Sequence, residues 1–385
     1  MDVSTSHSVT GLAASQAIGL SAPYVDEDEE QAVLEVLRSG RLAFGPMTEE
    51  FERALAERVG APYVAALSSG TAGLHLGVKL AGIAPGDEVV TTPLSFIASA
   101  NAIVYEGGTP VFADVDERTL NLDPATVEAA ITPRTKALVL VDLFGYPLDF
   151  DAFRDLAERH GLAIVEDACE ALGATYRGQP VGSFGHPAVF AFYPNKQVTT
   201  GEGGAIALGT ESEWEVVKSL ANQGRVDRGE TFAHDRIGYN YRLDELSAAV
   251  GVAQLRKLDR ILALREEVAS RYTALLESVE GVLLLCPDDE TYRRSWFVYV
   301  VFIEPPVERS TVMKRLAAEG IASKPYLPAI HLQSAYHDRY GFGPGMFPVA
   351  EAAGAQGLAL PFHTALSAAE QEQVADALKR AVQAG

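Results

Sequence analysis

Short apolar runs alternate with helical stretches through most of the first two hundred residues. Runs that fit strands occupy 63–67, 88–91, 111–115, 137–141, 163–166, 189–192 and 205–208. Stretches whose apolar positions recur every three or four residues occupy 26–38, 48–59, 72–81, 95–105, 124–131 and 150–160. Strands that alternate with helices predict right-handed crossovers and a mostly parallel sheet covered by helices on both faces.

The pattern changes after residue 204. A helix over 213–221 is followed by an irregular polar segment over 222–243, and then by one long helical stretch over 244–277 without proline. A strand at 297–303, a helix at 310–319, an irregular stretch over 324–347 and a final helix at 368–382 complete the chain. We expect a mobile tail over 1–18, a large α/β domain over 19–245 and a smaller α+β domain over 246–385.

Composition adds limits on compartment and partners. The 385 residues contain 48% hydrophobic and 22% charged side chains, which is typical of a globular protein. The two cysteines, Cys169 and Cys286, have no ligand spacing, so neither a disulfide framework nor a zinc site is expected, and a cytoplasmic location fits. A net charge of −21 argues against nucleic acid or an anionic membrane as partner, and no apolar run reaches membrane-spanning length. An anionic substrate would therefore need local cations.

Lys196 is the central candidate for catalysis. It lies between the predicted strands 189–192 and 205–208, in a connection that continues as Thr199-Thr200-Gly201-Glu202-Gly203-Gly204. An ammonium is costly to desolvate, so a lysine held in a confined site can lose its proton and attack a carbonyl to form a Schiff base. The alternative is a surface lysine on a hairpin loop.

Ser69-Gly70-Thr71 follows the first strand and begins a helix. The first N–H groups of a helix are unpaired and lie at the positive end of its dipole, so they bind phosphate readily. The alternative is that Ser69 or Thr71 only caps the helix.

Two carboxylates end the strand at 163–166. Glu166 and Asp167 should point to opposite sides of the sheet, and the one facing the crevice could pair with a protonated pyridine nitrogen. For Glu166 we favour a solvated acidic turn. Phe96 begins a helix beside the same crevice, where it could stack on a cofactor ring or fill core.

These motifs, in this order and spacing, resemble the pyridoxal-phosphate-dependent nucleotide-sugar aminotransferases of the DegT/StrS type. The likeness also includes Gly86-Asp87-Glu88-Val89, Gly238-Tyr239-Asn240-Tyr241-Arg242 and His331-Leu332-Gln333, and it extends from about residue 20 to the C-terminus. It implies the aspartate aminotransferase fold of fold type I, with a mostly parallel seven-stranded sheet sandwiched by helices and a smaller α+β C-terminal domain.

The resemblance also implies roles for the residues. Lys196 would carry pyridoxal 5'-phosphate as a Schiff base and move the proton, Asp167 would pair with the pyridinium, Phe96 would stack on the ring, and Ser69, Gly70 and Thr71 would cradle the phosphate. Asn240 would reach the phosphate from the partner of a homodimer with shared sites. Arg242 and His331 would face the nucleotide sugar, and an amino acid, L-glutamate, would be the donor. The turn after Lys196 resembles the branch acting on 4-keto-6-deoxy sugars.

Two positions depart from the family pattern. The family usually has a serine five residues before the lysine, as a phosphate ligand, where this chain has Ala191. A missing hydrogen bond to a charged acceptor costs about 1.5–3 kcal/mol if nothing replaces it. Three residues after the aspartate the family most often has glutamine, near the phenolic oxygen of the cofactor, where this chain has Glu170. An acid there would repel a phenolate unless it is protonated or turned away.

Three alternatives stay open at this point. One is an aminotransferase of the same family that acts on a 3-keto sugar or a cyclitol. A deoxygenating dehydratase of the same fold is disfavoured, because that branch has histidine where this chain has Lys196. The third is a ligand-binding or regulatory protein that keeps the fold without turnover, which the changes at Ala191 and Glu170 would suit.

Overall fold

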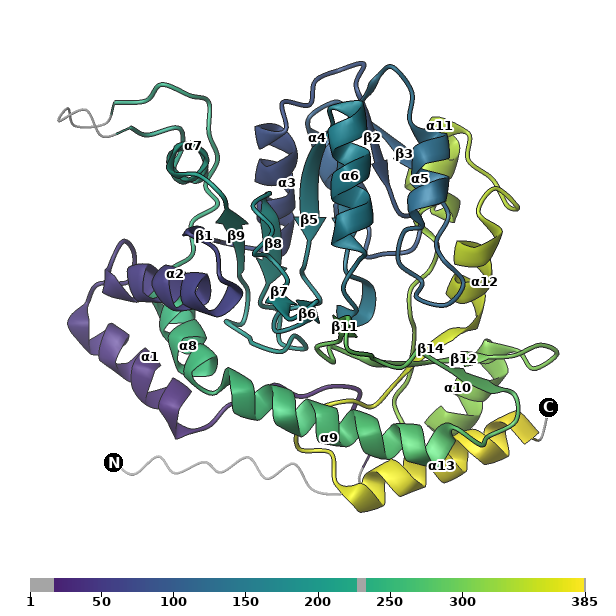
Figure 1. Ribbon diagram of the computed structural model, residues 1–385. Coiled ribbons are helices and arrows are strands. Elements are labelled where there is room, and N and C mark those ends of the chain that lie inside the picture. Colours follow the sequence, from purple (N-terminus) through teal and green to yellow (C-terminus); the bar gives the residue numbers. More distant parts are fainter. Residues whose placement is uncertain (1–16, 227–232, 384–385) are drawn as a thin grey trace, which may run out of the picture.

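A seven-stranded sheet forms the centre of the larger part of the molecule (Figure 1). The computed structural model describes residues 17–226 and 233–383. The strand order is β1-β9-β8-β5-β4-β2-β3, and β9 alone in this sheet runs antiparallel to its neighbours β1 and β8. The strands are β1 (Tyr63–Leu67), β2 (Glu88–Thr91), β3 (Thr109–Phe112), β4 (Thr135–Val141), β5 (Ala163–Asp167), β8 (Ala188–Ala191) and β9 (Gly204–Leu208). The expected mostly parallel seven-stranded sheet is confirmed.

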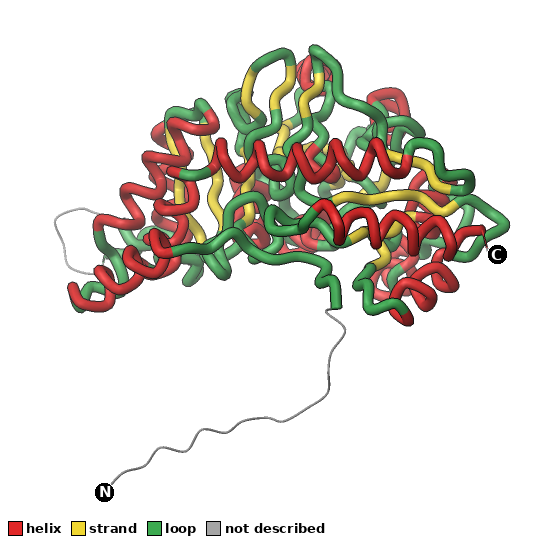
Figure 2. Tube along the Cα trace, turned by 90° about the horizontal axis from the view of Figure 1, so that it is seen from below, coloured by secondary structure: helices red, strands yellow, loops and turns green. Residues whose placement is uncertain are grey.

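Successive strand residues fill two different cores, one on each face of the sheet. Val64 and Ala66 of β1 pack into one core, whereas Ala65 and Leu67 pack into the other. The first core lies under helices α2 (Pro46–Val59), α5 (Pro124–Ala130), α6 (Phe150–His160) and α8 (Glu245–Arg256). The second lies under α3 (Gly70–Leu80), α4 (Ala98–Tyr105) and α7 (Glu211–Ala221). The view from below in Figure 2 shows strands enclosed by helices.

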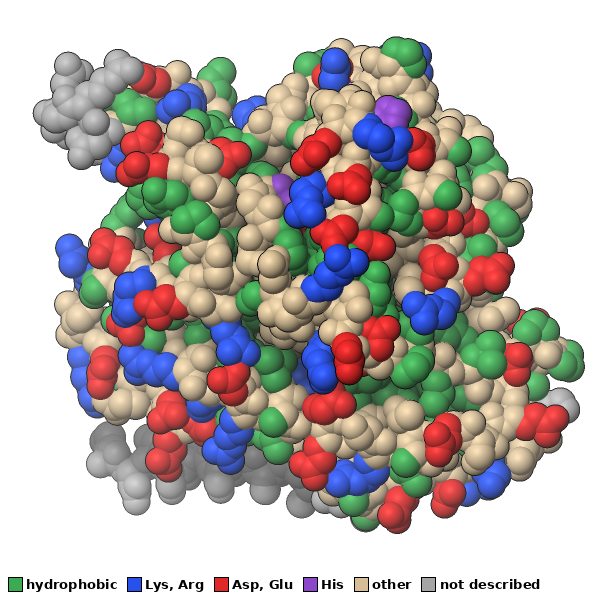
Figure 3. Space-filling model, in the orientation of Figure 1, with side chains coloured by type: hydrophobic (Ala, Val, Ile, Leu, Met, Phe, Trp, Pro, Cys, Tyr) green, Lys and Arg blue, Asp and Glu red, His purple; other side chains and the backbone are tan. Residues whose placement is uncertain are grey.

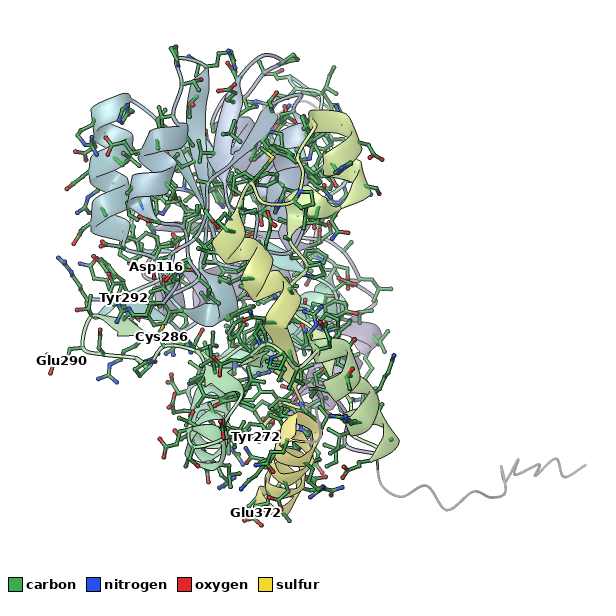
Figure 4. All side chains as sticks on the ribbon, turned by 90° about the vertical axis from the view of Figure 1, so that its right-hand side faces the viewer. Asp116, Tyr272, Cys286, Glu290, Tyr292 and Glu372 are labelled. Carbon is green, nitrogen blue, oxygen red and sulfur yellow. The ribbon has the colours of Figure 1, made fainter. Side chains whose placement is uncertain are left out.

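The C-terminal part forms its own core around a four-stranded antiparallel sheet of order β10-β12-β14-β13. Its strands are β10 (Val282–Leu284), β12 (Tyr299–Ile303), β13 (Lys324–Pro325) and β14 (Gly357–Leu360). Its helices are α9 (Leu258–Leu276), α10 (Arg309–Ala318), α11 (Ser334–Tyr340), α12 (Pro348–Gln356) and α13 (Ala368–Gln383). Tyr272 of α9, labelled in Figure 4, is buried in this core and donates a hydrogen bond to the carbonyl of Pro361.

A small three-stranded sheet joins the two parts. Strands β6 (Thr175–Tyr176) and β7 (Gln179–Pro180) come from the first part, and β11 (Tyr292–Arg293) from the second. Tyr292, labelled in Figure 4, pairs with Tyr176, and its ring stacks on that of Tyr146 at 5.4 Å. The segment directly after β11 leads to Phe297, which matters for the site described below.

Two expectations about local structure were wrong. The single long helix over 244–277 is two helices, α8 and α9, because the chain leaves the helical conformation at Lys257. The Lys257 amine bonds Asp26 and Glu29 at the start of helix α1 (Glu27–Ser39), which fixes the break. The third strand ends at Phe112 and not at Val115.

The expected tail falls mostly outside the described residues. Of residues 1–18 only Ala17 and Ile18 are described, and Ile18 is buried and pairs with Ile321, so this end of the predicted tail is held in place. Helix α8 packs against α1 and α2, whereas α9 packs against α13. The domain limits at residues 245 and 246 stay a prediction.

Candidate active site

Lys196 lies in the loop that joins β8 to β9, as the sequence predicted. Because β9 returns antiparallel beside β8, both ends of this loop stay at the carboxyl end of β5 and β8. Two backbone bonds close the loop, from Phe192 to Gly203 at 3.0 Å and from Thr200 to Phe192 at 2.9 Å. The N–H of Lys196 bonds the carbonyl of Tyr193 at 2.9 Å, so the lysine sits in a tight turn.

The Lys196 amine is held between a carboxylate and an aromatic ring. Its Nζ lies 3.8 Å from Oε1 of Glu170 and 3.8 Å from the ring centroid of Phe297. The side chain keeps 13% of its surface exposed, and the amine opens into a cavity of about 1080 Å³. This cavity is called the lysine pocket below. A surface lysine on a hairpin is thereby excluded.

The first turn of α3 lines the lysine pocket with Ser69, Gly70 and Thr71. Ser69 is the N-cap of α3, and its hydroxyl accepts a bond from the N–H of Ala72 at 3.1 Å. The capping interpretation therefore holds for the Ser69 side chain. In the described part of the chain, the N–H groups of Gly70 and Thr71 have no acceptor, so they remain available to a phosphate.

Ala191 stands directly beside this turn. A Cβ on Gly70 would lie 2.7 Å from Cβ of Ala191 and 2.9 Å from Sγ of Cys169, so only glycine fits there. Ala191 and Cys169 both line the lysine pocket. A serine at position 191 would thus place its hydroxyl next to the free N–H groups.

Asp167 faces the lysine pocket from the end of β5. Ser99 of α4 donates to its Oδ2 at 2.6 Å, and the N–H of Cys169 donates to its Oδ1 at 3.2 Å. Two donors hold this carboxylate in one orientation, on the same face of the sheet as α3. Such a carboxylate can pair with a protonated ring nitrogen.

Glu166 points to the opposite face and is fully buried, so the expected solvated acidic turn was wrong. Its Oε1 accepts from the N–H of Gly182 at 3.1 Å, and its Oε2 lies 2.9 Å from Nε2 of His186. Burial raises the pKa of Glu166 to about 8 and lowers the pKa of His186 to about 4. Between these values both groups are neutral, so the contact is a hydrogen bond and not an ion pair.

Glu170 is buried and bonded on the side away from the pocket. Its Oε2 accepts from the N–H of Phe144 at 2.9 Å, while Oε1 faces Lys196. Burial raises the pKa of Glu170, and the nearby Lys196 cation opposes that shift. A raised pKa favours the protonated acid, which can donate a hydrogen bond where an ionised carboxylate would repel an anionic oxygen.

The ring of Phe96 also lines the lysine pocket and is 62% exposed, so it does not fill core. Tyr193, 52% exposed, lies on the same pocket wall. Both rings are free to contact a ligand. From the C-terminal part the pocket receives Phe297, Lys324, Tyr326 and Gln333.

Asn240 and Arg242 line a different cavity of about 1120 Å³, which we call the arginine hollow. Its lining includes four cationic residues and three acidic ones: Lys218, Arg225, Arg236 and Arg242, and Glu215, Asp235 and Asp244. Arg242 donates to Asn222 at 3.0 Å and Gln223 at 2.8 Å, and lies 5.0 Å from the ring of Phe44. The two cavities share no lining residue. Within one chain, the structure does not bring Asn240 or Arg242 to Lys196.

His331 does not reach either cavity. Its side chain is fully buried, bonds Glu351 at 3.1 Å and packs edge-on against Phe347 at 4.8 Å. Its neighbours Ile330 and Gln333 line the lysine pocket in its place. In this structure, His331 supports the loop and does not contact the pocket, contrary to the expectation that it faces the substrate.

Sequence reasoning missed several residues of the pocket. Ser99 and Phe297 hold Asp167 and Lys196, yet both lie in ordinary apolar stretches that gave no signal. Arg265 of α9 donates to the carbonyl of Lys196 at 3.0 Å. The sequence did contain a signal for Arg265, because this arginine occupies a position in the apolar stripe of the predicted helix, where a charged residue is unusual.

The lysine pocket suits the cofactor that the resemblance implies. One cavity contains three groups that such a cofactor needs. The free N–H groups of Gly70 and Thr71 suit its phosphate, the Asp167 carboxylate suits its ring nitrogen, and the Lys196 amine suits its aldehyde. Within residues 17–226 and 233–383, no cluster of side chains could hold a metal ion. None of the helices in those same ranges is long and apolar enough to cross a membrane.

The comparisons with known proteins agree with one another. The model of the DegT/DnrJ/EryC1/StrS aminotransferase family matches residues 23–379. GDP-perosamine synthase of Caulobacter vibrioides is 39% identical over 364 residues, covering 94% of this chain and 97% of that protein.

Two solved structures are close in shape. DesV of S. venezuelae, in complex with a ketimine intermediate, is 35% identical, with a TM-score of 0.88 over 95% of this chain and 99% of that chain. The PLP form of a protein named as sugar aminotransferase Spr1654 from Streptococcus pneumoniae is 29% identical, with a TM-score of 0.91 over 96% of this chain and 99% of that chain. Its PMP form matches with the same TM-score.

Proposed function

The chain belongs to the DegT/DnrJ/EryC1/StrS aminotransferase family and is a pyridoxal-phosphate-dependent sugar aminotransferase of fold type I, and on that premise we propose its substrates. We propose that it transfers the amino group of L-glutamate to a 4-keto-6-deoxyhexose linked to a nucleoside diphosphate. One relative is named as a synthase of a GDP-linked sugar, which supports a nucleotide-linked acceptor.

The observation that carries the proposal is the joint presence of Lys196, Asp167 and the free N–H groups of Gly70 and Thr71 in the lysine pocket. Pyridoxal phosphate, when bound there, supplies an aldehyde that carries the amino group and a ring that takes up electrons. Gly70 and Thr71 bind its phosphate at the start of α3. Asp167, fixed by Ser99, keeps its ring nitrogen protonated.

Lys196 has two tasks in this arrangement. With the cofactor bound, the Lys196 amine would hold it covalently, and in its free form the same amine would move a proton between the substrate carbon and the cofactor. Glu170 in its protonated form donates a hydrogen bond to the phenolic oxygen of the cofactor, as a glutamine would. Phe96 covers one side of the ring and keeps water from it.

The acceptor is bound across two chains. We propose a homodimer in which Asn240 and Arg242 of one chain complete the lysine pocket of the other, because in a single chain they line the separate arginine hollow. Asn240 is exposed, as a residue that contacts a partner must be. The lining of the hollow has four cationic and three acidic residues, so it is locally more positive than a chain of net charge −21. The face in Figure 3, by contrast, shows acidic and basic side chains interspersed.

The choice of carbon 4 rests on the turn after Lys196. Thr199 and Thr200 are buried and bond within the turn, to Phe192 and Glu202, so their side chains do not face substrate. Glu202 and Gly203 line the lysine pocket instead. They decide which ketone of the hexose comes within about 3–3.5 Å of the reacting nitrogen.

Borohydride reduction of the holoenzyme, followed by peptide mapping, tests the attachment. The label should lie on Lys196, and a label on another lysine would contradict the assignment. The free cysteines Cys169 and Cys286 fit the cytoplasm as the proposed compartment.

A panel of nucleotide-linked keto sugars with the pyridoxamine form tests the acceptor. Turnover should favour the nucleoside-diphosphate 4-keto-6-deoxyhexoses, and NMR of the product should show the new amine at carbon 4. Equal or better turnover of a 3-keto isomer would move the assignment to carbon 3. Regeneration of the pyridoxamine form by L-glutamate, measured against other amino acids, tests the donor.

A further inference from the structure

Arg265 is a buried cation without a carboxylate partner. It lies in the middle of α9, only 3% exposed, on the buried stripe that also contains Ile261, Val268 and Tyr272. In the described part of the chain it forms no ion pair, and its Nε has no hydrogen-bond partner. Burial lowers the pKa of Arg265 to about 10, so it stays charged at neutral pH. A charge buried in this way is costly unless its surroundings replace water.

Main-chain carbonyls from two distant segments take the place of water around Arg265. One nitrogen of its guanidinium donates to the carbonyls of Lys196 at 3.0 Å and Asn195 at 3.4 Å. The other donates to the carbonyls of Phe297 at 3.1 Å and Trp296 at 3.3 Å. The planar fork of arginine is suited to hold two such groups at a fixed separation.

The two segments that Arg265 joins are the two that set the position of the Lys196 amine. The Lys196 Nζ lies 3.8 Å from the ring centroid of Phe297, so the backbone atoms bonded to Arg265 belong to the reactive residue and to the ring beside it. Gln197 adds a second connection, since its Nε2 donates to the carbonyl of Glu170 at 2.6 Å and to the hydroxyl of Ser295 at 3.0 Å.

We propose that Arg265 is a positioning residue. It holds the loop between β8 and β9, called the lysine loop below, against the segment that contains Trp296 and Phe297, so that the Lys196 amine points at the aldehyde of the cofactor. This inference rests on the proposed attachment of the cofactor to Lys196. Arg265 lies outside the pocket lining. It acts through the main chain of Lys196 and Phe297.

Arg265→Met and Arg265→Lys test the proposal. Methionine removes the charge and all four bonds, whereas lysine keeps a charge but concentrates its donors on one nitrogen, so it cannot span both segments in the same way. Arg294→Met is the matched control. Arg294 is also buried and stacks on Trp296 of the same segment, but it is paired with Asp288 at 3.9 Å, and among the described residues it makes no bond to the loop between β8 and β9.

The deciding measurement is the affinity for two forms of the cofactor. Pyridoxamine phosphate depends on the phosphate and ring contacts but cannot form a Schiff base with Lys196. Pyridoxal phosphate depends on the same contacts and also on the orientation of the Lys196 amine. We expect both Arg265 variants to weaken pyridoxal phosphate binding about ten- to hundredfold and to change pyridoxamine phosphate binding less than about twofold. Reductive methylation of Lys196 in the apo-protein, read by peptide mapping, should slow by a similar factor.

Equal losses for both cofactor forms would overturn the proposal, because they would show a structural role alone. So would an unchanged methylation rate at Lys196, or the same selective loss in Arg294→Met. If Arg265→Met fails to fold, Arg265→Lys still tests the proposal, through the loss of pyridoxal phosphate affinity relative to the loss of pyridoxamine phosphate affinity. A wild-type protein that does not attach the cofactor at Lys196 would instead refute the proposed function, so the two failures are distinguishable.

Discussion

The lysine pocket and the arginine hollow are nearly equal in volume, about 1080 and 1120 Å³, but they differ in which groups they contain. The pocket contains Lys196, three acidic residues (Asp167, Glu170 and Glu202) and free main-chain N–H groups. The hollow contains four cationic residues, three acidic residues and the amide of Asn240. The first can perform chemistry on a small cofactor, whereas the second can bind an anion but contains no group to react with it.

This difference is what the proposed division of the site between two chains would require. Arg242 is held on the outer side by Asn222 and Gln223, and its main chain is bridged to Leu67, directly before the turn that begins α3. The hollow is therefore attached through the main chain to the strand that leads into Ser69, Gly70 and Thr71 of the lysine pocket. A twofold symmetric pair can offer each hollow to the opposite pocket, and the predictions below test that relation.

The largest effect should come from disabling each cavity in turn. Lys196→Ala and Asn240→Ala should each abolish turnover, the first by roughly 10⁴-fold, because the amine performs both attachment and proton transfer. A mixture of the two variants in equal amounts should recover up to about a quarter of wild-type activity, since half of the dimers would be hybrids with one intact site.

Subunit exchange must be shown for this experiment, for instance by native mass spectrometry of tagged chains. Verified hybrids without any recovered activity would mean that each chain uses its own Asn240. That result would contradict the proposal that the arginine hollow of one chain completes the lysine pocket of the other.

Arg242→Ala tests the cation of the hollow. We expect the KM for the nucleotide sugar to rise about tenfold with little change in kcat, because the lost charge-assisted bond is made to the diphosphate and not to the reacting carbon. Arg256→Ala is a suitable control, since this arginine is exposed, pairs with Glu50 and lies outside both cavities. An unchanged KM in Arg242→Ala would remove Arg242 from the substrate site.

Glu170→Gln tests the acid of the lysine pocket. The pKa of Glu170 is raised by burial, so the acid is protonated below that value and ionises as the pH rises through it. Wild-type affinity for pyridoxamine phosphate should therefore fall with rising pH, and that of Glu170→Gln should stay level, with a difference of up to about tenfold at the alkaline end. Parallel pH profiles would show that Glu170 does not face the cofactor oxygen.

The smallest effect is expected from Ala191→Ser. Its hydroxyl would stand beside the first turn of α3 and could donate to the cofactor phosphate, tightening binding about threefold to tenfold. Ala191→Gly serves as the control, because it alters the same site without adding a donor. Equal affinities in the serine variant and wild type would indicate that another group already satisfies the phosphate.

The sequence predicted the sheet and the lysine loop because both depend on local periodicity. Short apolar runs separated by helical stretches identify the seven strands of the large sheet closely enough to place Lys196, Asp167 and Gly70 at one edge. The fold class and the cofactor are confirmed by the relatives. The roles of individual site residues and the domain limits stay predictions.

Other features depend on contacts between distant residues and could not be predicted in this way. The break at Lys257 has no glycine or proline and exists because Asp26 and Glu29 bind the lysine from another helix. Glu166 can be buried because His186 and the N–H of Gly182 form hydrogen bonds with its carboxyl group. His331 can be buried because Glu351 forms a hydrogen bond with its ring. A single sequence shows none of these partners.

The antiparallel return of β9 has a consequence for how such an enzyme diversifies. In the loop between β8 and β9, residues 195–197 are bonded to Arg265 and Ser295 of the C-terminal part, whereas Glu202 and Gly203 contact the pocket from the other arm. The two arms are separated by Thr199 and Thr200, whose bonds stay inside the turn. Substitutions in the second arm can therefore alter which sugar is accepted while the reacting amine keeps its place, so substrate preference and chemistry can evolve separately within a single hairpin.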